Sequence, residues 1–529
     1  MAAIAALAAI AVIVAFTFGD YGLGWDDYTH AQYGELLLNL YASGFTDTRA
    51  LSFVNLYMYG GGFDMAAGLL AKILPHDLFE TRRLLGAIVG IIGLAVTWRL
   101  ARHVGGKLAG LIALLLLACN PIFYGHMFIN AKDAPFAVAM VILLFGLIRI
   151  IEEYPRPHIA IVGLFGLGLG LSLGTRIMGG MAALYVIAPM AMLIFTDARR
   201  DGTLKAARNL GHFLLALAPG FVLAYALMAL LWPWSVLEPL NPIRAVGYFS
   251  TFFEKPWREM FEGVAISVPN MPRSYIPVLF SLKMPEIFLA LAIGGTICGI
   301  MANLRPSIPV RRRAVLALIV AAGILPLVIA VIIRPAMYNG IRHFTFVLPP
   351  LAILGGLAGA WLLQWLWQRG RPVAVAASLA MLGMLSLPVS AMVSLHPYQY
   401  AHFNWISGGV QHADNLYMLD YWGLAFKQAS KELRRKLAAH LEMQPGAPRW
   451  RIAVCGPHPT VEVELGSKFV ITWDTKDADF AMMLDEFYCT DLNAPVVVEI
   501  ERDGVVFARV YDLRGRSIPD MFAVPPLNP

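Results

Sequence analysis

Apolar runs long enough to cross a lipid bilayer recur along most of this chain. A helix needs about 20 apolar residues to cross about 30 Å of hydrocarbon. Runs of this kind occupy residues 2–18, 84–101, 108–124, 134–151, 159–175, 178–196, 211–232, 285–303, 314–333, 344–367 and 373–393. The sequence therefore predicts an α-helical polytopic membrane protein with about eleven transmembrane helices. The first run lacks the basic segment and the small-residue cleavage site of a signal peptide, so we interpret it as an uncleaved span.

The composition supports a membrane protein. Hydrophobic residues make up 58% of the chain and charged residues only 14%, and the mean hydropathy is +0.64. Soluble domains carry charge on about a quarter of their residues. The formal net charge is +6, but the basic residues stand in short clusters between apolar runs and form no stripe with interleaved aromatic residues. Membrane lipids are therefore an expected partner, and nucleic acid is not.

The basic clusters also predict an orientation. Lys and Arg gather in alternate loops, at 99–107, 149–156, 199–208, 305–313 and 369–371. The positive-inside rule places such loops in the cytoplasm. The N-terminus is then predicted inside and the C-terminus outside.

Two domains are predicted. Residues 1–395 form the transmembrane domain, with external loops at 19–83 and 233–284, and residues 396–529 form a small extracytoplasmic α/β domain. Strands are expected at 451–455, 467–473 and 479–484, with a helix near 424–441 and a hairpin at 496–513. In an oxidising compartment Cys455 and Cys489 can form a disulfide, and two buried free thiols are the alternative.

Two polar clusters lie at the predicted outer ends of apolar runs, where ionisable residues are functional candidates. The first contains Asp26 and Asp27, with His30 close behind; either carboxylate can cap a helix or face a cleft. The second is Asn130-Ala-Lys132-Asp133-Ala-Pro, in which Asp133 and the proline suit a helix start. That interpretation does not explain Lys132, whose ammonium either snorkels or binds a phosphate.

Further cations are predicted on the same outer side, against the topology rule. They are Arg176, Arg334, Arg342 and His343. A bound lipid phosphate would explain them, because guanidinium groups hold phosphate bidentately. Salt bridges to Asp26 or Asp133 are the alternative. The glycine-rich run before Arg176 favours close helix packing and lacks the Gly-Lys-Ser/Thr ending of a phosphate loop.

Carboxylates and cations on one outer face suit glycosyl transfer from a polyprenyl-phosphate sugar. A carboxylate takes the proton of an acceptor hydroxyl, and cations or a metal stabilise the departing lipid phosphate. This predicts a glycosyltransferase whose partners are a polyprenyl-phosphate-linked sugar and a lipid, glycan or protein acceptor. A polyprenyl-phosphate-sugar transporter or a sugar-binding sensor without transfer chemistry is the alternative.

The motifs resemble the C-type glycosyltransferase superfold. The resemblance is strongest to the family of dolichyl-phosphate-mannose protein mannosyltransferases and bacterial lipid A aminoarabinose transferases. It runs from the acidic pair through Asn130-Ala-Lys-Asp-Ala-Pro to Arg342-His343-Phe-Thr-Phe-Val-Leu-Pro-Pro, and includes His396-Pro-Tyr-Gln-Tyr-Ala-His-Phe-Asn. It implies an inverting enzyme of the bacterial inner membrane with its active site facing the periplasm.

The resemblance also implies roles for single residues. Asp26 is the expected base, although Asp27 stands where relatives often have Glu, so the choice between them stays open. Asp133 supports the cations or binds the acceptor. In Asp420-Tyr-Trp-Gly, Tyr421 and Trp422 either pack at a helix start or line the acceptor cleft, for which His30 and Asn130 are the other candidates. Some relatives bind a divalent metal, for which His30 or His343 are the candidate ligands.

Overall fold

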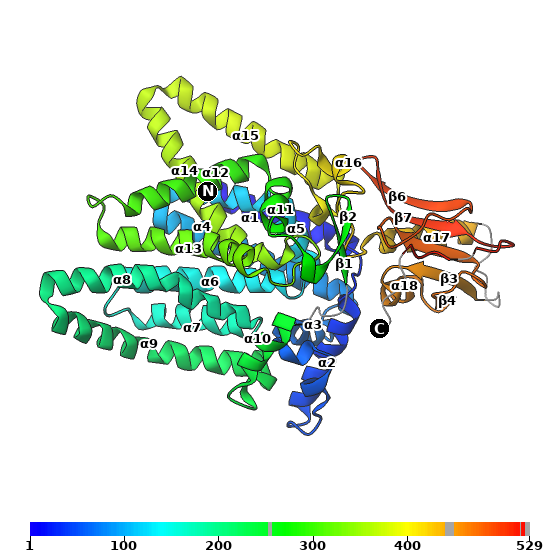
Figure 1. Ribbon diagram of the computed structural model, residues 1–529, viewed down its shortest axis with the longest axis horizontal. Helices are drawn as coiled ribbons and strands as arrows, with labels where there is room; N and C mark the ends of the chain where they lie inside the picture. Colours follow the sequence, from blue (N-terminus) through cyan, green and yellow to red (C-terminus); the bar gives the residue numbers. More distant parts are fainter. Residues whose placement is uncertain (252–256, 440–448, 519, 524–529) are drawn as a thin grey trace.

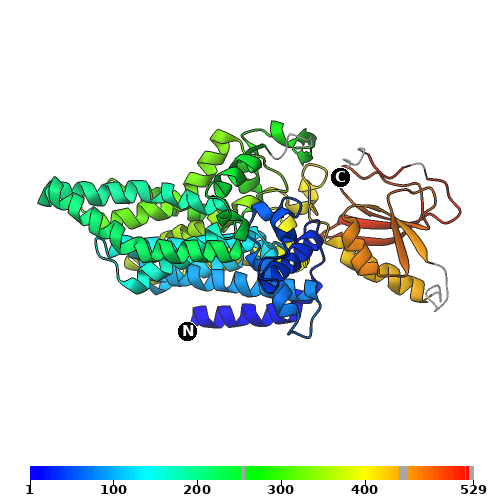
Figure 2. The same ribbon diagram turned by 90° about the horizontal axis from the view of Figure 1, so that it is seen from below.

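The computed structural model describes residues 1–251, 257–439, 449–518 and 520–523. Small parts of the predicted second external loop, of the helix near 424–441 and of the C-terminal domain lie outside these ranges. The chain forms a long helical bundle with a small sheet domain at one end (Figure 1). A view turned by 90° shows the same arrangement, with the first helix along one edge of the bundle (Figure 2).

The bundle is built from long apolar helices. They are α1 (Ala2–Thr17), α4 (Leu78–Ala118), α6 (Asp133–Glu152), α7 (Ile159–Leu173), α8 (Ala182–Asp201), α9 (Thr203–Leu231), α12 (Glu286–Asn303), α13 (Val310–Ile333), α14 (Leu348–Arg369) and α15 (Arg371–Ser394). Within the described ranges, nine helices are long and apolar enough to cross a membrane. The predicted multi-pass helical fold is confirmed.

The longest helix, α4, contains the predicted run 84–101 and the first part of the run 108–124, and it turns back on itself. Gly106 has a φ of +85°, a conformation that suits glycine. A Cβ on Gly110 would lie 2.7 Å from the Cβ of Arg102, whereas eight residues of straight helix span about 12 Å. The two halves of α4 therefore run back against each other. The helix α7 is shorter than a usual span, and the count of eleven spans and the orientation remain predictions.

One predicted boundary is wrong. The apolar run 108–124 is not one helix, because α4 ends at Ala118 and α5 (Pro121–Ile129) begins after a break. The Asn120 side chain accepts a hydrogen bond from the Phe123 N–H at 3.1 Å, and Pro121 occupies the first turn. An N-cap followed by proline starts a new helix whatever the hydropathy of the run.

Shorter elements cover the end of the bundle that faces the sheet domain (Figure 1). They are α2 (Asp27–Ala42), α3 (Gly62–Ala71), α10 (Asn241–Thr251), α11 (Tyr275–Lys283), α16 (Gly409–Ala413) and the hairpin of β1 (Arg258–Phe261) and β2 (Val264–Ser267). On α2, Tyr33, Leu37 and Leu40 recur at helical spacing and pack with Leu56 in a small apolar core. These elements hold the loops that carry the predicted polar clusters.

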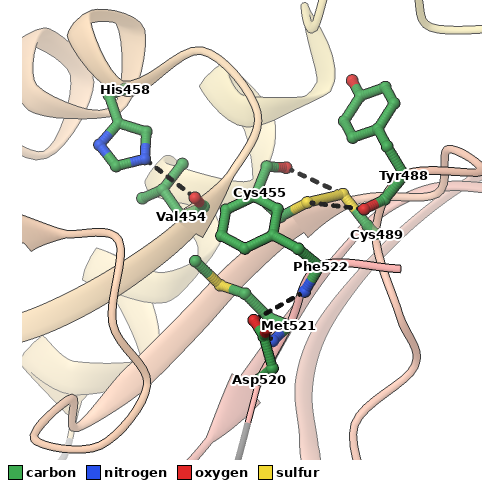
Figure 3. Close-up of a disulfide and its surroundings, with 8 residues drawn as sticks. All are labelled: Val454, Cys455, His458, Tyr488, Cys489, Asp520, Met521 and Phe522. Carbon is green, nitrogen blue, oxygen red and sulfur yellow. Dashed lines mark hydrogen bonds between the residues drawn. A yellow bond between two sulfur atoms is a disulfide. The ribbon is translucent and has the colours of Figure 1, made fainter. Parts of the chain in front are cut away.

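The C-terminal domain has a five-stranded sheet in the order β4-β3-β5-β7-β6. Its strands are β3 (Trp450–Cys455), β4 (Phe469–Thr472), β5 (Phe480–Leu484), β6 (Val496–Arg502) and β7 (Val505–Asp512), and its helices are α17 (Ala425–Ala439) and α18 (His458–Leu465). β3 pairs in parallel with β4 and β5, while β7 is antiparallel to β5 and β6. The strands, the hairpin and the helix expected here are confirmed, and Cys455 and Cys489 are joined by a disulfide (Figure 3).

Candidate active site

The adjacent carboxylates that begin α2 have different environments. Asp27 is buried, and it accepts hydrogen bonds from both terminal nitrogens of Arg83 at 2.9 and 2.6 Å and from the Gly24 N–H at 2.8 Å. The Asp26 side chain is 44% exposed and makes no capping hydrogen bond. Asp27 is thus engaged in holding the loop, whereas Asp26 can meet a substrate.

Asp133 lies at the start of α6 and is buried. Arg176, at the end of the loop after α7, places Nη2 2.6 Å from Asp133 Oδ1. The Asn130 amide donates to Asp133 Oδ2 at 2.8 Å, and its carbonyl accepts from the backbone N–H groups of Lys132 and Asp133. Asn130 therefore fixes this turn, and Asp133 fixes Arg176.

Arg342 joins the two carboxylate regions. Its Nη1 lies 3.8 Å from Asp26 Oδ2 and 3.8 Å from Asp133 Oδ2. The guanidinium carbon also lies 4.9 Å from the ring centroid of Tyr338 and 4.8 Å from that of Trp422. These rings hold the cation by cation–π attraction at long ion-pair distances, which leaves its charge available to a further anion.

Lys132 lies beside a tyrosine and not against a carboxylate. Its Nζ is 4.5 Å from the ring centroid of Tyr59, and the guanidinium of Arg176 is 5.6 Å from the same ring. Among the described residues, no carboxylate oxygen is placed within 4 Å of this ammonium to form a salt bridge. Burial lowers the pKa of Lys132 to about 8, although the negative charge of Asp26 opposes the shift.

The charges of this cluster act on Asp26 as well. Partial burial would raise the pKa of Asp26, but the positive charges of Lys132 and Arg342 lower it below its ordinary value. Asp26 is therefore ionised at neutral pH. The cluster of Asp26, Lys132, Asp133, Arg176 and Arg342 combines one accessible carboxylate with three cations.

His343 and Arg334, the other two predicted cations, lie outside the group of five charged residues. His343 follows Arg342 in the chain, and its ring meets Tyr338 edge-on with the centroids 5.0 Å apart. Arg334 ends α13 and donates from Nε and Nη2 to the Met271 carbonyl, so its contacts lie outside the cluster. The structure thus brings His343 to the rim of the cluster and uses Arg334 to attach another loop.

His30 is part of a buried network. Its Nδ1 lies 2.7 Å from Asp64 Oδ2, and the other oxygen of Asp64 accepts from Arg82 Nη2 at 2.7 Å. Across the parts of the chain that the structure describes, no group of three His, Cys, Asp or Glu side chains is placed to share a metal ion. The residues present do not fit a metal site, and we assign none.

The Asp420-Tyr-Trp-Gly segment both starts a helix and contacts the charged cluster. The carboxylate of Asp420 accepts from the backbone N–H groups of Gly423, Leu424 and Ala425, each at 2.9 Å, as at a helix start. The Tyr421 hydroxyl lies 3.0 Å from His126 Nε2. Trp422 covers Arg342, so this segment closes the cluster from the side of the C-terminal domain.

Several contributing residues were not predicted. Tyr59 and Tyr338 lie beside the cations, while Arg82, Arg83 and Asp64 form the buried ion pairs below them. Adjacent arginines at the start of an apolar helix, on the side predicted to be external, go against the topology rule and could have indicated the ion pairs. The tyrosines carry no such local signal.

Comparisons with known proteins bear on the fold and on the family of the chain. Residues 63–232 match the family model of dolichyl-phosphate-mannose-protein mannosyltransferase. The crystal structure of ArnT from Cupriavidus metallidurans bound to undecaprenyl phosphate superposes with a TM-score of 0.52 at 15% identity, covering 96% of this chain and 97% of that one. The chain has an ArnT-like fold.

A second solved structure is less similar. The archaeal oligosaccharyltransferase AglB from Archaeoglobus fulgidus, in complex with an inhibitory peptide and a dolichol-phosphate, gives a TM-score of 0.48 at 12% identity and covers 87% of this chain and 66% of that one. No curated protein matches the sequence. The family match and the ArnT-like fold confirm the resemblance to membrane glycosyltransferases that the sequence motifs predict.

Proposed function

We propose that this protein is an inverting glycosyltransferase that moves a sugar from a polyprenyl-phosphate carrier to an acceptor. The observation that carries the proposal is the half-exposed Asp26 carboxylate beside Arg342 and Lys132. A base and cations for a leaving phosphate are the two needs of this reaction. The family match and the ArnT-like fold support the same reaction class.

Asp26 acts as the general base. An acceptor hydroxyl attacks the anomeric carbon, and the new C–O bond forms as the bond from that carbon to the phosphate oxygen breaks. The hydroxyl proton passes to Asp26, and the electron pair of the broken bond leaves with the polyprenyl phosphate. Attack from the face opposite the phosphate inverts the anomeric centre.

The cations hold the donor and stabilise the charge that grows on its phosphate. Arg342 and Lys132 are the first candidates, because each lies near Asp26 and neither is held in a close salt bridge. Arg176 is bound to Asp133 at 2.6 Å and contributes mainly by positioning. Asp133 orients Arg176 and limits the repulsion between the guanidinium groups.

The proposed reaction also indicates which sugar donor is used and on which side of the membrane the protein acts. ArnT was crystallised with undecaprenyl phosphate, which supports a polyprenyl carrier for this chain. An activated lipid supplies the free energy of transfer where no nucleotide is present. We therefore place the protein in a bacterial inner membrane, with the cluster facing the periplasm and a lipid, glycan or protein as acceptor.

The test is complementation of a deletion strain with Asp26→Asn. The wild-type gene should restore a sugar modification that mass spectrometry detects on lipids, glycans or proteins, and Asp26→Asn should lower it by about 100-fold or more. Glu35→Gln is the matched control, because Glu35 is an exposed carboxylate on the same helix. Full modification by a folded Asp26→Asn protein would refute the role of Asp26.

The transporter alternative is tested with purified protein. Transfer of sugar in detergent, where no membrane separates two compartments, requires chemistry and not flipping. Wild-type protein should transfer sugar from a polyprenyl-phosphate donor to the acceptor that the deletion strain identifies. Binding of the donor without any transfer would favour the transporter.

A further inference from the structure

A cavity lies between the C-terminal sheet domain and the segment that enters it. Its volume is about 170 Å³, and its walls come from residues 414–419, from the end of β5 with the loop after it, from β7 and from Met260 on β1. The share of one water molecule in the liquid is about 30 Å³, so the cavity has room for one small polar molecule. None of the five residues of the cluster lines it.

The walls offer mainly hydrogen-bond acceptors and ring faces. Four carboxyl groups line the cavity, those of Asp414, Asp485, Glu486 and Asp491. The one cation, Arg509, already lies 2.8 Å from Asp485 and 3.0 Å from Asp491. Tyr417, Phe487 and Tyr511 add aromatic surface. A ligand of this cavity must therefore carry several hydrogen-bond donors.

Among the polar groups that line this cavity, the buried Glu486 gives the clearest indication of a bound ligand. It is only 7% exposed, and its Oε1 has no hydrogen-bond partner among the residues that the structure describes. A buried polar atom without a partner costs free energy, so a ligand that supplies one is favoured. Burial, reinforced by the negative charges of Asp420 and Glu259, raises the pKa of Glu486 well above its ordinary value. Burial thus favours the neutral form of this carboxyl, which can donate a hydrogen bond to a ligand hydroxyl as well as accept one.

We propose that this cavity binds one monosaccharide unit of the acceptor, which makes the acceptor a glycan or a glycolipid. Sugar hydroxyls donate to carboxyl groups, and the apolar face of a sugar ring packs on aromatic side chains. The inference rests on the proposed transferase function and assigns the acceptor class that function leaves open.

The position of the cavity suits an acceptor subsite. Leu419 lines the cavity, and three residues later Trp422 lies 4.8 Å from the guanidinium of Arg342. Three extended residues span at most about 11 Å. This path through Trp422 and Arg342 bounds the distance from the cavity wall to Asp26 Oδ2 at about 25 Å, so an acceptor sugar in the cavity would reach Asp26 through several further units of the same glycan. Cys489 also lines the cavity, and its disulfide to Cys455 anchors this wall to β3 (Figure 3).

The binding test uses full-length protein in detergent and saturation-transfer NMR. The probes are the methyl glycosides of D-glucose, D-galactose and D-mannose, and at least one should bind. Glu486→Leu should weaken that binding by about tenfold, consistent with the loss of one or two hydrogen bonds. Asp491→Asn changes an exposed wall residue and should weaken binding several-fold without affecting the fold. Glu499→Gln is the matched control, because Glu499 pairs with Arg509 at 2.9 Å but does not line the cavity.

Three results would overturn the proposal. The first is that none of the glycosides binds. The second is that binding is unchanged in both wall variants. The third is that the cavity binds the cation of calcium chloride or of methylammonium chloride and not the sugars. The same titration in Asp26→Asn separates the two proposals, because that variant should lose transfer and keep glycoside binding. If binding is absent but transfer still depends on Asp26, only the subsite is refuted. If binding is present but Asp26→Asn transfers sugar normally, only the catalytic assignment is refuted.

Discussion

Asp26 and Asp27 show how neighbouring residues of one type can have unrelated roles. Asp27 is 3% exposed and accepts hydrogen bonds from both terminal nitrogens of Arg83. Arg82 Nε lies 3.8 Å from Asp27 Oδ1. Asp27→Asn removes the carboxylate that forms a buried salt bridge with Arg83. Breaking a buried ion pair by removing one partner costs about 3–5 kcal/mol. We expect Asp27→Asn to lower the thermal unfolding midpoint in detergent, whereas Asp26→Asn leaves it unchanged. Equal midpoints for the two variants would contradict this assignment.

Lys132 should give the reaction a pH dependence. Its pKa lies near 8, below the ordinary value for lysine, so the ammonium is present below pH 8 and is lost as the pH rises through that value. If the ammonium binds the donor phosphate, kcat/KM for the donor falls above about pH 8, because kcat/KM reports the free enzyme. Lys132→Arg keeps its charge at all these pH values, so the fall should disappear from its profile. An unchanged alkaline limb in Lys132→Arg would assign that limb to another group.

The polar cluster was partly predictable from single residues. Lys132, Asp133 and Arg342 stand out because charges at the outer ends of apolar runs need a local reason. Tyr59 and Tyr338 were missed because a tyrosine in an external loop is ordinary until the fold places a cation over its ring. The choice between Asp26 and Asp27 was equally hidden, since it depends on Arg83, more than 50 residues away.

At the scale of elements, the glycines of α7 allow close packing of helices. A Cβ on Gly168 would lie 2.5 Å from the backbone of Leu143 on α6, whereas a Cβ on Gly163 would meet nothing within 4 Å. Backbone atoms cannot move aside as a side chain can. Gly168→Leu should therefore destabilise the protein by about 1–3 kcal/mol or more, seen as a lower unfolding midpoint in detergent. Gly163→Leu is the matched control on the same helix and should have little effect.

The elements themselves were largely predictable because periodicity and length are local signals. The strands of the C-terminal sheet follow from alternating or fully apolar runs, and the hairpin follows from Asp503-Gly504 at its turn. The break at Asn120-Pro121 was missed because hydropathy does not register a cap. The order of strands in the sheet was beyond the sequence, since β3, β5 and β7 pair across long stretches of chain.

At the scale of the whole molecule, the fold gathers charges from four distant segments at one end of the bundle. Asp26, Lys132, Arg176 and Arg342 come from separate loops, and the C-terminal domain covers that end (Figure 1). The basic loops that should face the cytoplasm include the turn between α8 and α9, which lies at the opposite end (Figure 1). If these basic loops face the cytoplasm, as the positive-inside rule predicts, the cluster faces the other side of the membrane.

This direction can be tested with two cysteines. In a background with Cys119 and Cys298 replaced by alanine, Arg434→Cys places a thiol on the exposed face of α17, and Thr203→Cys places one at the exposed first residue of α9, beside its turn to α8. A membrane-impermeant maleimide added to cells with a permeabilised outer membrane should label Arg434→Cys at once. It should label Thr203→Cys only after the inner membrane is broken. The reverse pattern would place Asp26 on the cytoplasmic side, where nucleotide sugars serve as donors. A lipid-linked sugar donor would then no longer be required.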